Sequence, residues 1–434
     1  MPTFLRIQDF HKLLAAFGST TLPPASATKK SNSQANRRMK SAVRNGTAIQ
    51  RGDRILTEQP FVFVLQAKYR KERCDNCLQA CKVLKCANCQ YVYYCGRDCQ
   101  MQCWRLHKIE CPFLKRIYPR IVPDAARMLC KLIIHLDKGG DLVRGYYTET
   151  CSRRFRDMMS HYGEIKNDAR RLEHLESLHG VLRDMMGESA IVPNLTELTS
   201  IYGRIFISYI DLLNTPEQRR AELQANYFFL CVCSKCTDVQ ETHEMLAAAC
   251  GNKNCNEYLD INLNNCPRCD TGVSPKQRNG YNEAMAITKM HLENMKDVAY
   301  FDVCKLCLAK QKGFVHPLNI WHVKTLDAAF EAAIDVLKWR EALEFGKELV
   351  VGFRKYLGDW HPLLGLLYLK IGKIQLYENY LPEAVNSLKE AQKILQVTHG
   401  RDHSLLREQL SPLLTQAVAE SSYPIMPFEN IFWL

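Results

Sequence analysis

The sequence predicts a multidomain α+β protein in which a small, irregular β part carries zinc-binding segments and the remainder is helical. Three observations lead to this prediction. Cysteine and histidine are concentrated at metal-ligand spacing in one short segment, 74–111. Apolar residues recur at helical spacing over much of 123–212 and again from about residue 281 onward. At 434 residues the chain is long enough for two or three domains with substantial cores.

The donors of segment 74–111 come as four closely spaced pairs. They are Cys74 and Cys77, Cys86 and Cys89, Cys95 and Cys99, and His107 and Cys111. Four pairs supply two tetrahedral zinc ions with four protein ligands each, so no position stays open and the zinc is structural. If the sites interleave, the first and third pairs share one ion and the second and fourth share the other. A disulfide framework is the alternative, but such spacing without a secretory segment favours metal.

A second cysteine-rich region has two parts. The first contains three candidate ligands, one short of a closed site: Cys231, Cys233 and Cys236. The second contains four with zinc-ribbon spacing: Cys250, Cys255, Cys266 and Cys269. Two further cysteines, Cys304 and Cys307, fall in a helical stretch and are interpreted as ordinary buried thiols.

The net charge of +12 is unevenly distributed. Residues 1–45 hold eight Lys or Arg and one Asp, and a Ser, Asn and Lys-rich composition there indicates a basic disordered arm. The arm is interpreted as a solvated tail, with a nuclear or mitochondrial address or a contact to an acidic surface as alternatives. No apolar run approaches the ~18 residues needed to span a bilayer, so no membrane association is expected.

Between these regions we expect strands within Ile49–Leu65, turning at Gly52, and helices at Ala125–Leu136, Arg153–Met159 and Ile165–Met185. Inside the first zinc segment, a strand is expected over Gln90–Tyr94 and a helix over Cys99–Lys108.

The C-terminal helices contain an internal repeat. The sequence pattern from Trp339 to Gly346 recurs from Leu381 to Leu388. This pattern resembles tetratricopeptide-type helix pairs with lengthened loops. Such stacks present a concave surface for peptides; a helical buttress for the rest of the chain is the alternative.

These features together resemble a known family. All eight donors of 74–111, with Tyr94 and Trp104, are similar to a MYND zinc finger. The chain as a whole resembles the SMYD proteins, which are SET-domain lysine methyltransferases using S-adenosylmethionine. The resemblance rests on the finger in a small β domain, the helical linker, the Cys-x-Cys-x2-Cys pattern and the tetratricopeptide-like helices. Further matching segments are 160–161, 171–175, 208–213, 218–220, 226–229 and 398–403.

The resemblance implies a division of the chain into seven parts. These are the basic disordered arm (1–45), N-terminal SET-like strands (46–70), the MYND finger (74–111), a helical linker (112–205), a residual SET and post-SET segment (206–236), a zinc-ribbon-like segment (237–275) and a tetratricopeptide-like helical domain (281–434).

The same resemblance assigns roles to four residues. Tyr209 matches the tyrosine near the transferred methyl group, Tyr227 a tyrosine of the lysine channel, Phe229 the ring that stacks on adenine, and His161 a cofactor contact. The family's Gly-x-Gly loop and Asn-His segment, however, have no counterpart, since neither pattern occurs in the chain. Most SET core strands are missing between residues 205 and 206, and with them the family's fourth ligand for Cys231, Cys233 and Cys236. The alternative for the aromatic residues is a structural role in the core of a residual sheet.

Three functions are therefore considered for a cytoplasmic and nuclear protein. The first is a zinc-binding relative, impaired in catalysis, that binds protein partners: proline-rich ligands at the MYND groove or peptide termini at the helical repeats. The second is an active methyltransferase acting on a histone or another lysine substrate with S-adenosylmethionine. The third is a nucleic-acid-associated regulator using basic residues of the finger. These are Lys82, Lys85, Arg97, Arg105 and Lys108.

Overall fold

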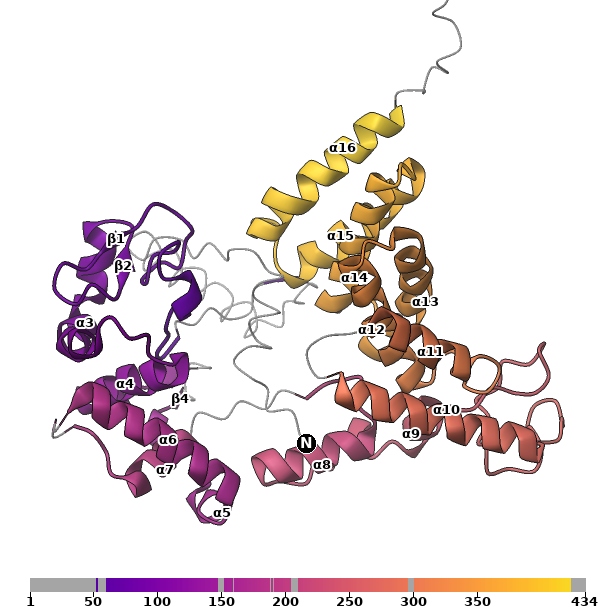
Figure 1. Ribbon diagram of the computed structural model, residues 1–434, viewed down its shortest axis with the longest axis horizontal. Helices are drawn as coiled ribbons and strands as arrows, with labels where there is room; N and C mark the ends of the chain where they lie inside the picture. The colour runs from indigo at the N-terminus through magenta and orange to yellow at the C-terminus, as the bar shows by residue number, and fades with distance from the viewer. Residues whose placement is uncertain are drawn as a thin grey trace, which may run out of the picture. The chain divides into compact units, whose positions relative to one another are not determined.

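The computed structural model describes residues 52–53, 60–146, 152–158, 160–187, 189, 191–203, 210–295 and 300–422. The predicted basic arm and most of the predicted N-terminal strands lie outside these residues. The chain divides into two compact units: Met1–Ile207 with His403–Leu405, and Ser208–Asp402 with Leu406–Leu434. Both are predominantly helical, and the described strands, all very short, belong to the first unit (Figure 1), which confirms the prediction of a multidomain α+β protein.

The first unit is organised around three helices that pack against one another, α3, α4 and α6. Its elements are η1 (Ala67–Tyr69), β1 (Leu84–Lys85), β2 (Tyr93–Tyr94), α3 (Arg97–Ile117), α4 (Asp124–Asp137), η2 (Gly140–Leu142), β3 (Gly145–Tyr146), β4 (Ser152–Arg153), η3 (Phe155–Asp157), α5 (Tyr162–Ile165), α6 (Ala169–Met186) and α7 (Leu195–Gly203). Helix α3 runs without interruption from the zinc-binding segment into the part that the sequence assigns to the linker.

The strand predicted over Gln90–Tyr94 is shorter than expected. Only Tyr93–Tyr94 pairs, antiparallel to Leu84–Lys85. Gln90 has a positive φ of 55°, and its N–H bonds back to the carbonyl of Cys86. This tight turn brings the sulfurs of a Cys-x2-Cys pair to one side of the chain, and an extended backbone could not do so.

The prediction of a helix at Arg153–Met159 is wrong. Ser152–Arg153 instead pairs with Gly145–Tyr146, and Phe155–Asp157 forms one 3₁₀ turn. The Asp157 carboxylate accepts from the backbone N–H and the guanidinium of Arg154, which closes that turn locally. The helix predicted over Ile165–Met185 begins later, at Ala169, because Asp168 caps the start of α6 by accepting from the Arg171 N–H; Ile165 ends the preceding short helix α5.

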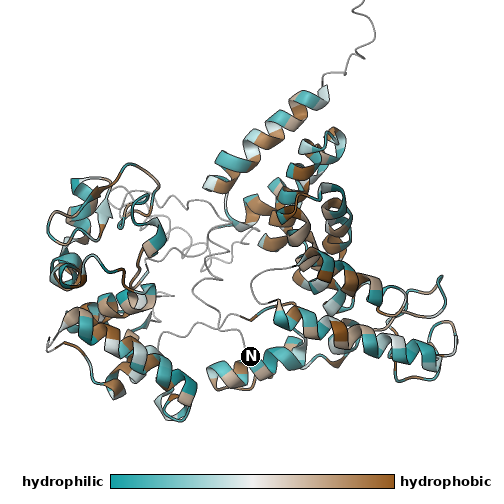
Figure 2. Ribbon diagram, viewed as in Figure 1, coloured by the Kyte–Doolittle hydropathy of each residue, from teal (hydrophilic) through white to brown (hydrophobic). Residues whose placement is uncertain are grey.

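The second unit is a succession of helices in which each one from α10 to α16 packs on the next. Its elements are α8 (Pro216–Tyr227), η4 (Ser234–Cys236), α9 (Val239–Met245), α10 (Pro275–Asn294), α11 (Phe301–Gln311), α12 (Ile320–Asp335), α13 (Trp339–Leu357), α14 (Pro362–Tyr377), α15 (Leu381–Thr398), the π-helix η5 (Leu405–Leu410) and α16 (Ser411–Ser422). Apolar and polar faces alternate around these helices (Figure 2). No helix in the described part of the chain is long and apolar enough to cross a membrane.

The internal repeat is visible in the backbone hydrogen bonds. The turn after α12 is closed by the Lys338 N–H donating to the Ala333 carbonyl at 2.8 Å, and the turn after α14 by the Tyr380 N–H donating to the Gln375 carbonyl at 2.7 Å. Glycine permits close helix packing here, because a Cβ at Gly372 would lie 2.7 Å from Leu388 Cγ. The repeated sequence therefore forms equivalent helix–turn–helix units.

The two repeat turns lead to a stability prediction. Leu337 and Asn379 occupy equivalent positions with φ of 60° and 62°, in a left-handed region that asparagine tolerates better than leucine. Leu337 is 66% exposed, so little packing is lost on substitution. Leu337→Asn should stabilise the helices by about 1 kcal/mol in urea unfolding, and the matched Asn379→Leu should destabilise them by a similar amount. Equal stability of all three proteins would contradict this explanation.

A pH-dependent effect is expected at Asp327 on α12. Burial raises the pKa of this carboxyl to about 7; the nearby carboxylates of Glu331 and Asp211 raise it further, while Lys370 lowers it. Between pH 4 and 7 the folded state then binds more protons than the unfolded state, so stability falls as the pH rises. Asp327→Asn should remove this slope and add about 2 kcal/mol at pH 8, after allowance for solvent screening. Urea unfolding at pH 4.5 and pH 8 measures it; Asp335→Asn, an exposed carboxylate on the same helix, should keep the wild-type slope.

Candidate metal centres

The structure gathers the donors of residues 74–111 into two sets of four. Within each set every ligand atom lies within 4.8 Å of the others. One set contains Cys74, Cys77, Cys95 and Cys99, and the other contains Cys86, Cys89, His107 and Cys111. The pairs alternate along the chain, which is the interleaved arrangement. The second set is entirely buried, and the first is partly exposed.

The separations within these sets fit zinc. Thiolates placed ~2.3 Å from a tetrahedral zinc lie about 3.8 Å from one another. The Cys77–Cys95 and Cys86–Cys111 sulfurs are each 3.9 Å apart, and Cys89 Sγ lies 3.8 Å from His107 Nε2. A disulfide would require about 2.05 Å. The donor set would hold zinc with no open position, so the metal would stabilise the fold rather than take part in a reaction.

Polar neighbours orient the ligands of the buried set. The Asn88 side-chain amide donates to Cys111 Sγ at 3.2 Å. His107 Nδ1 lies 3.3 Å from Glu110 Oε2, one turn further along α3. A carboxylate at Nδ1 fixes the ring so that Nε2 presents its lone pair to the metal.

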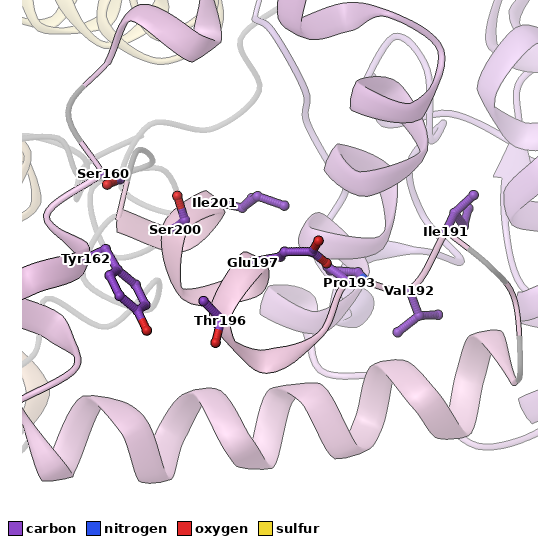
Figure 3. A pocket seen from close by; sticks show the side chains of 9 residues that line it. All are labelled: Ser160, Tyr162, Ile191, Val192, Pro193, Thr196, Glu197, Ser200 and Ile201. Atoms are coloured by element: carbon purple, nitrogen blue, oxygen red, sulfur yellow. The ribbon is translucent and has the colours of Figure 1, made fainter.

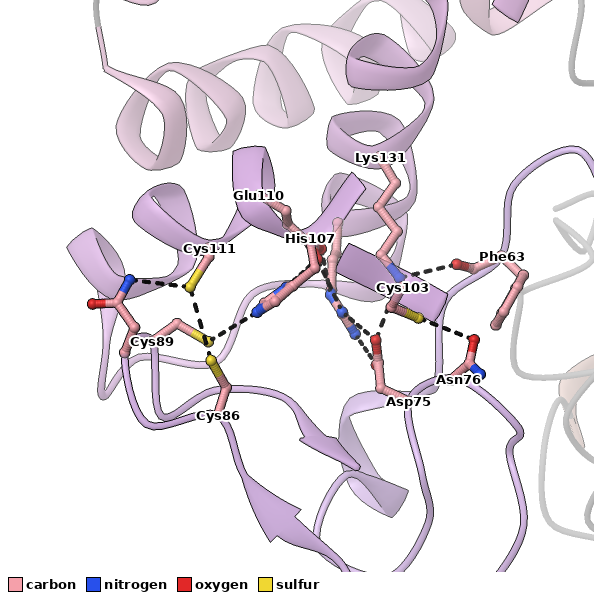
Figure 4. Close-up of polar contacts among 12 residues, drawn as sticks. Phe63, Asp75, Asn76, Cys86, Cys89, Cys103, His107, Glu110, Cys111 and Lys131 are labelled. Carbon is pink, nitrogen blue, oxygen red and sulfur yellow. Dashed lines mark hydrogen bonds and ion pairs between the residues drawn. The ribbon is translucent and has the colours of Figure 1, made fainter. Parts of the chain in front are cut away.

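Glu110 belongs to a buried ionic network that connects both zinc sets to α4 (Figure 4). Arg127 Nε donates to Glu110 at 2.9 Å, and its two terminal nitrogens donate to the two Asp75 oxygens at 2.7 and 2.9 Å. Lys131, one turn along α4, also contacts Asp75 and the Phe63 carbonyl. Asp75 follows Cys74 of one set, and Glu110 precedes Cys111 of the other. One guanidinium therefore links the side chains of two residues that each adjoin a ligand, one in each set.

The network is almost free of solvent. The side chains of Asp75, Glu110 and Arg127 are 4%, 0% and 4% exposed. Burial alone would raise the pKa of Glu110, but the Arg127 and Lys131 charges and the bond to His107 lower it to about 2. The pKa of Asp75 is likewise held well below its usual range by Arg127 and Lys131, against the effect of burial. Both carboxylates are thus charged and depend on Arg127 for compensation.

The ribbon cysteines form a third set of four. Cys250, Cys255, Cys266 and Cys269 lie within 4.8 Å of one another, with Cys250–Cys269 and Cys255–Cys266 sulfur separations of 3.5 and 3.8 Å. Hydrogen bonds attach the ribbon to the helices: Gln277 of α10 donates to the Ala249 carbonyl, and Asn319 before α12 donates to the Ala247 carbonyl.

The remaining cysteines differ in their surroundings. Cys231, Cys233 and Cys236 converge as a group of three. Cys304 and Cys307 are fully buried on α11 and belong to no ligand group among the described residues, as expected for ordinary buried thiols. Cys103 donates to the Asn76 side chain.

The residues matched to catalysis and cofactor binding are not assembled within either described unit. Tyr209 lies outside the described residues. Tyr227 ends helix α8, and Phe229 follows it with 47% of its surface exposed, so neither lies in the residual sheet that the sequence predicts. His161 lies in the first unit, where it precedes α5 with a φ of 47°.

A surface pocket of about 650 Å³ lies beside His161 (Figure 3). Its lining comes from the two residues flanking His161, from α7 and from the segment before it: Ser160, Tyr162, Ile191, Val192, Pro193, Thr196, Glu197, Ser200 and Ile201. Glu197, its acidic side chain, is engaged in a reciprocal helix cap with Asn194. The lining contains one aromatic ring, Tyr162, and no aromatic pair that would enclose an adenine or a lysine. The lining of this one pocket therefore offers S-adenosylmethionine no aromatic enclosure.

Sequence reasoning missed the buried network of Asp75, Glu110, Arg127 and Lys131. Two local signals could have indicated it. Glu110 follows the ligand His107 by three residues on one helix, and Arg127 and Lys131 interrupt the apolar face of α4 with a spacing of one turn. Two cations on a core-facing helix surface require buried acidic partners.

Comparison with known proteins places the first zinc segment in a defined class. The sequence profile of the MYND finger matches residues 74–111.

The chain is also similar over most of its length to known methyltransferases. It is 23% identical to the human histone-lysine N-methyltransferase SMYD3 over 421 residues, covering 84% of this chain and 92% of that protein. It is 24% identical to the histone-lysine N-methyltransferase ASHR1 of Arabidopsis thaliana over 444 residues, covering 86% and 92%. It is 22% identical to the chicken N-lysine methyltransferase SMYD2 over 428 residues, covering 82% and 91%. Each aligned length exceeds the covered part of this chain, so each relative contains residues without a counterpart here.

Proposed function

Since the chain belongs to the SMYD family, we propose that it acts as a zinc-dependent protein-interaction module and not as a methyltransferase. The main observation in favour of the proposal is that this chain keeps the zinc ligands of the family and lacks its cofactor motifs. All eight MYND donors are present and converge in two sets of four, whereas the Gly-x-Gly and Asn-His cofactor motifs of the family are missing from the sequence. We propose that the protein acts in the cytoplasm and the nucleus.

The surface of the finger supports a role in binding proteins. Met101 and Trp104 are 56% and 48% exposed and lie one turn apart on α3, where the Trp104 ring is 6.2 Å from the ring of the candidate zinc ligand His107. Leu84 on β1 is 64% exposed. Exposed Trp and Met are typical anchors of protein interfaces. By family resemblance the ligand would be a proline-rich peptide, with peptide termini as ligands of the helical repeats.

The surroundings of the matched catalytic residues support the loss of methyl transfer. Transfer requires a dry channel that holds the lysine and the sulfonium in line within ~0.5 Å. Phe229, the match for the adenine-stacking ring, is half exposed, and Tyr227 ends a helix. Phe229 therefore lacks the enclosed support that such a channel needs.

An active lysine methyltransferase is the second candidate. The specific observation in its favour is the full-length similarity to relatives whose names state histone-lysine or protein-lysine methyltransferase activity. A third candidate, nucleic-acid binding, is favoured by the exposure of the five basic residues of the finger: Lys82, Lys85, Arg97, Arg105 and Lys108.

Calorimetry separates the first two candidates. Zinc-loaded full-length protein titrated with S-adenosylmethionine should give no binding heat at ligand concentrations up to the millimolar range. Micromolar binding would overturn the proposal and favour the enzyme.

Binding of a synthetic proline-rich peptide tests the interaction surface. Trp104→Ala should weaken binding at least tenfold. The matched control Tyr146→Ala, which removes an aromatic ring of similar exposure outside the finger, should leave it unchanged. Duplex DNA that binds with a steep salt dependence, while the peptide does not bind, would favour the nucleic-acid candidate instead.

A further inference from the structure

We infer that Cys231, Cys233 and Cys236 form a three-thiolate zinc centre with an open fourth position, which takes a cysteine side chain from an apolar segment of a partner protein. The inference does not depend on whether the protein binds S-adenosylmethionine, because it rests on the geometry of the three cysteines themselves.

The three sulfurs are already gathered for one ion. Each lies within 4.8 Å of the others. The segment folds back on itself at η4, where the N–H groups of Cys236 and Thr237 both donate to the Cys233 carbonyl at 3.0 and 3.1 Å. Cys236 is buried beneath this turn, Cys231 is partly buried and Cys233 is exposed. One side of the group therefore faces the protein and the other faces solvent.

The charge beneath the group suits a metal thiolate. Zn²⁺ with three thiolates carries a net charge of −1. Arg219 of α8, which is 2% exposed, interacts with the Cys236 side chain. The same guanidinium donates to the carbonyls of Asn214 and Lys235 and to the Glu241 carboxylate, at 2.7 to 2.9 Å. It is fixed in place by these bonds, and a fourth thiolate on the solvent side would complete a tetrahedral site.

The described residues of this chain supply no fourth donor to the group. Cys130, Cys304 and Cys307 are completely buried in other helices. The remaining described thiols outside the metal sets, Cys81 and Cys103, belong to no ligand group among the described residues. Zinc prefers four ligands, so the open position favours an external donor.

The surroundings of the open position indicate the kind of donor. Four apolar residues close to the cysteines in sequence are unusually exposed. They are Phe229 at 47%, Leu230 at 52%, Val232 at 77% and Val239 at 81%. Single exposed apolar residues are common, but a run of them around a metal group indicates a surface that is covered in use. A cysteine flanked by apolar residues would coordinate the metal and bury this surface together. The thiol would bind as thiolate and release its proton to the solvent.

Cobalt substitution provides the test, because Co²⁺ absorption responds to the number of bound thiolates. Full-length protein is reduced with a phosphine, so that no thiol is added, and loaded with Co²⁺. Four ions per chain should bind, and a blocked Leu-Cys-Val peptide should change the spectrum to that of an additional four-thiolate site. The Leu-Ser-Val peptide should have no effect, and 2-mercaptoethanol should bind at least tenfold more weakly than Leu-Cys-Val.

Two variants make the test specific. Cys233→Ser should abolish the response to the peptide and lower the bound Co²⁺ to three, while Cys81→Ser, which removes an exposed thiol outside the metal sets, should behave as wild type. Three ions in the wild type would overturn the inference. A spectrum in which all four Co²⁺ sites already have four ligands before any thiol is added would also overturn it. Cys151→Ser would then show whether Cys151 supplies the fourth ligand of the site at Cys231, Cys233 and Cys236.

Discussion

Replacing Arg127 by methionine should destabilise the first unit by about 3 to 5 kcal/mol, because it leaves two buried carboxylates without their counter-charge. Asp75 and Glu110 are 4% and 0% exposed and both contact this guanidinium. Since Glu110 also orients the zinc ligand His107, zinc should be released at a lower urea concentration than in the wild type. Unfolding in urea with a chromophoric zinc indicator measures both effects in one experiment.

Two comparisons distinguish the network from a general effect of losing an arginine. Arg105→Met, on the exposed face of α3, should change stability by less than about 0.5 kcal/mol. Combining Arg127→Met with Asp75→Asn and Glu110→Gln should restore at least half of the loss, because no buried charge then remains unpaired. If the single Arg127 variant unfolds like the Arg105 variant, the bridge between the zinc sets is not important for stability.

The network also explains why the finger and the following helices form one folded unit. Arg127 joins residues 17 and 52 positions away in the sequence, and α3 itself continues from the finger into the linker. Metal binding would organise the loop that carries Asp75 and hold it beside α3, which carries Glu110, and the two carboxylates in turn position α4 through Arg127. Loss of zinc should therefore disturb the helices of the first unit as well as the finger.

The sequence predicts those features of the site that depend on local spacing. Pairs of donors with two to four residues between them can reach one ion whatever surrounds them, so the two zinc sets of the finger and the ribbon set could be proposed from the sequence alone. The partners of Arg127 could not, because its contact with the distant Asp75 depends on how α4 packs against the finger. The number of ligands around Cys231 was likewise apparent, but the exposure of its apolar neighbours was not.

The errors in the fold have a similar explanation. Helical spacing at Arg153–Met159 was overridden by the Arg154–Asp157 contacts, which close a single turn and end it. The turn at Gln90 shortened the predicted strand, because ligand geometry takes precedence over the alternation of apolar residues. Periodicity was a reliable guide in the C-terminal helices, where each helix packs on its sequence neighbour and the internal repeat extends to individual hydrogen bonds.

The other large effect is expected at the ribbon. Cys266→Ala should remove one zinc ion and destabilise the helical unit by more than about 5 kcal/mol, since zinc supplies ~10–16 kcal/mol to small zinc-bound modules. Cys266 is 1% exposed and packs in the same apolar core as α10 and α12. The ribbon carbonyls of Ala247 and Ala249 accept from Asn319 and Gln277, so its unfolding would leave polar groups of both helices unpaired.

Cys307→Ala is the matched control for this prediction. Cys307 is equally buried in the same unit but lies outside every ligand group among the described residues. Loss of the Cys307 thiol should lower the free energy of unfolding by only about 1 kcal/mol and should leave the zinc content unchanged. Zinc content by elemental analysis and thermal unfolding followed by circular dichroism give the two readouts. Equal destabilisation by the two substitutions would mean that the ribbon cysteines stabilise the helices by packing alone, and metal would then have no part in holding the repeat domain together.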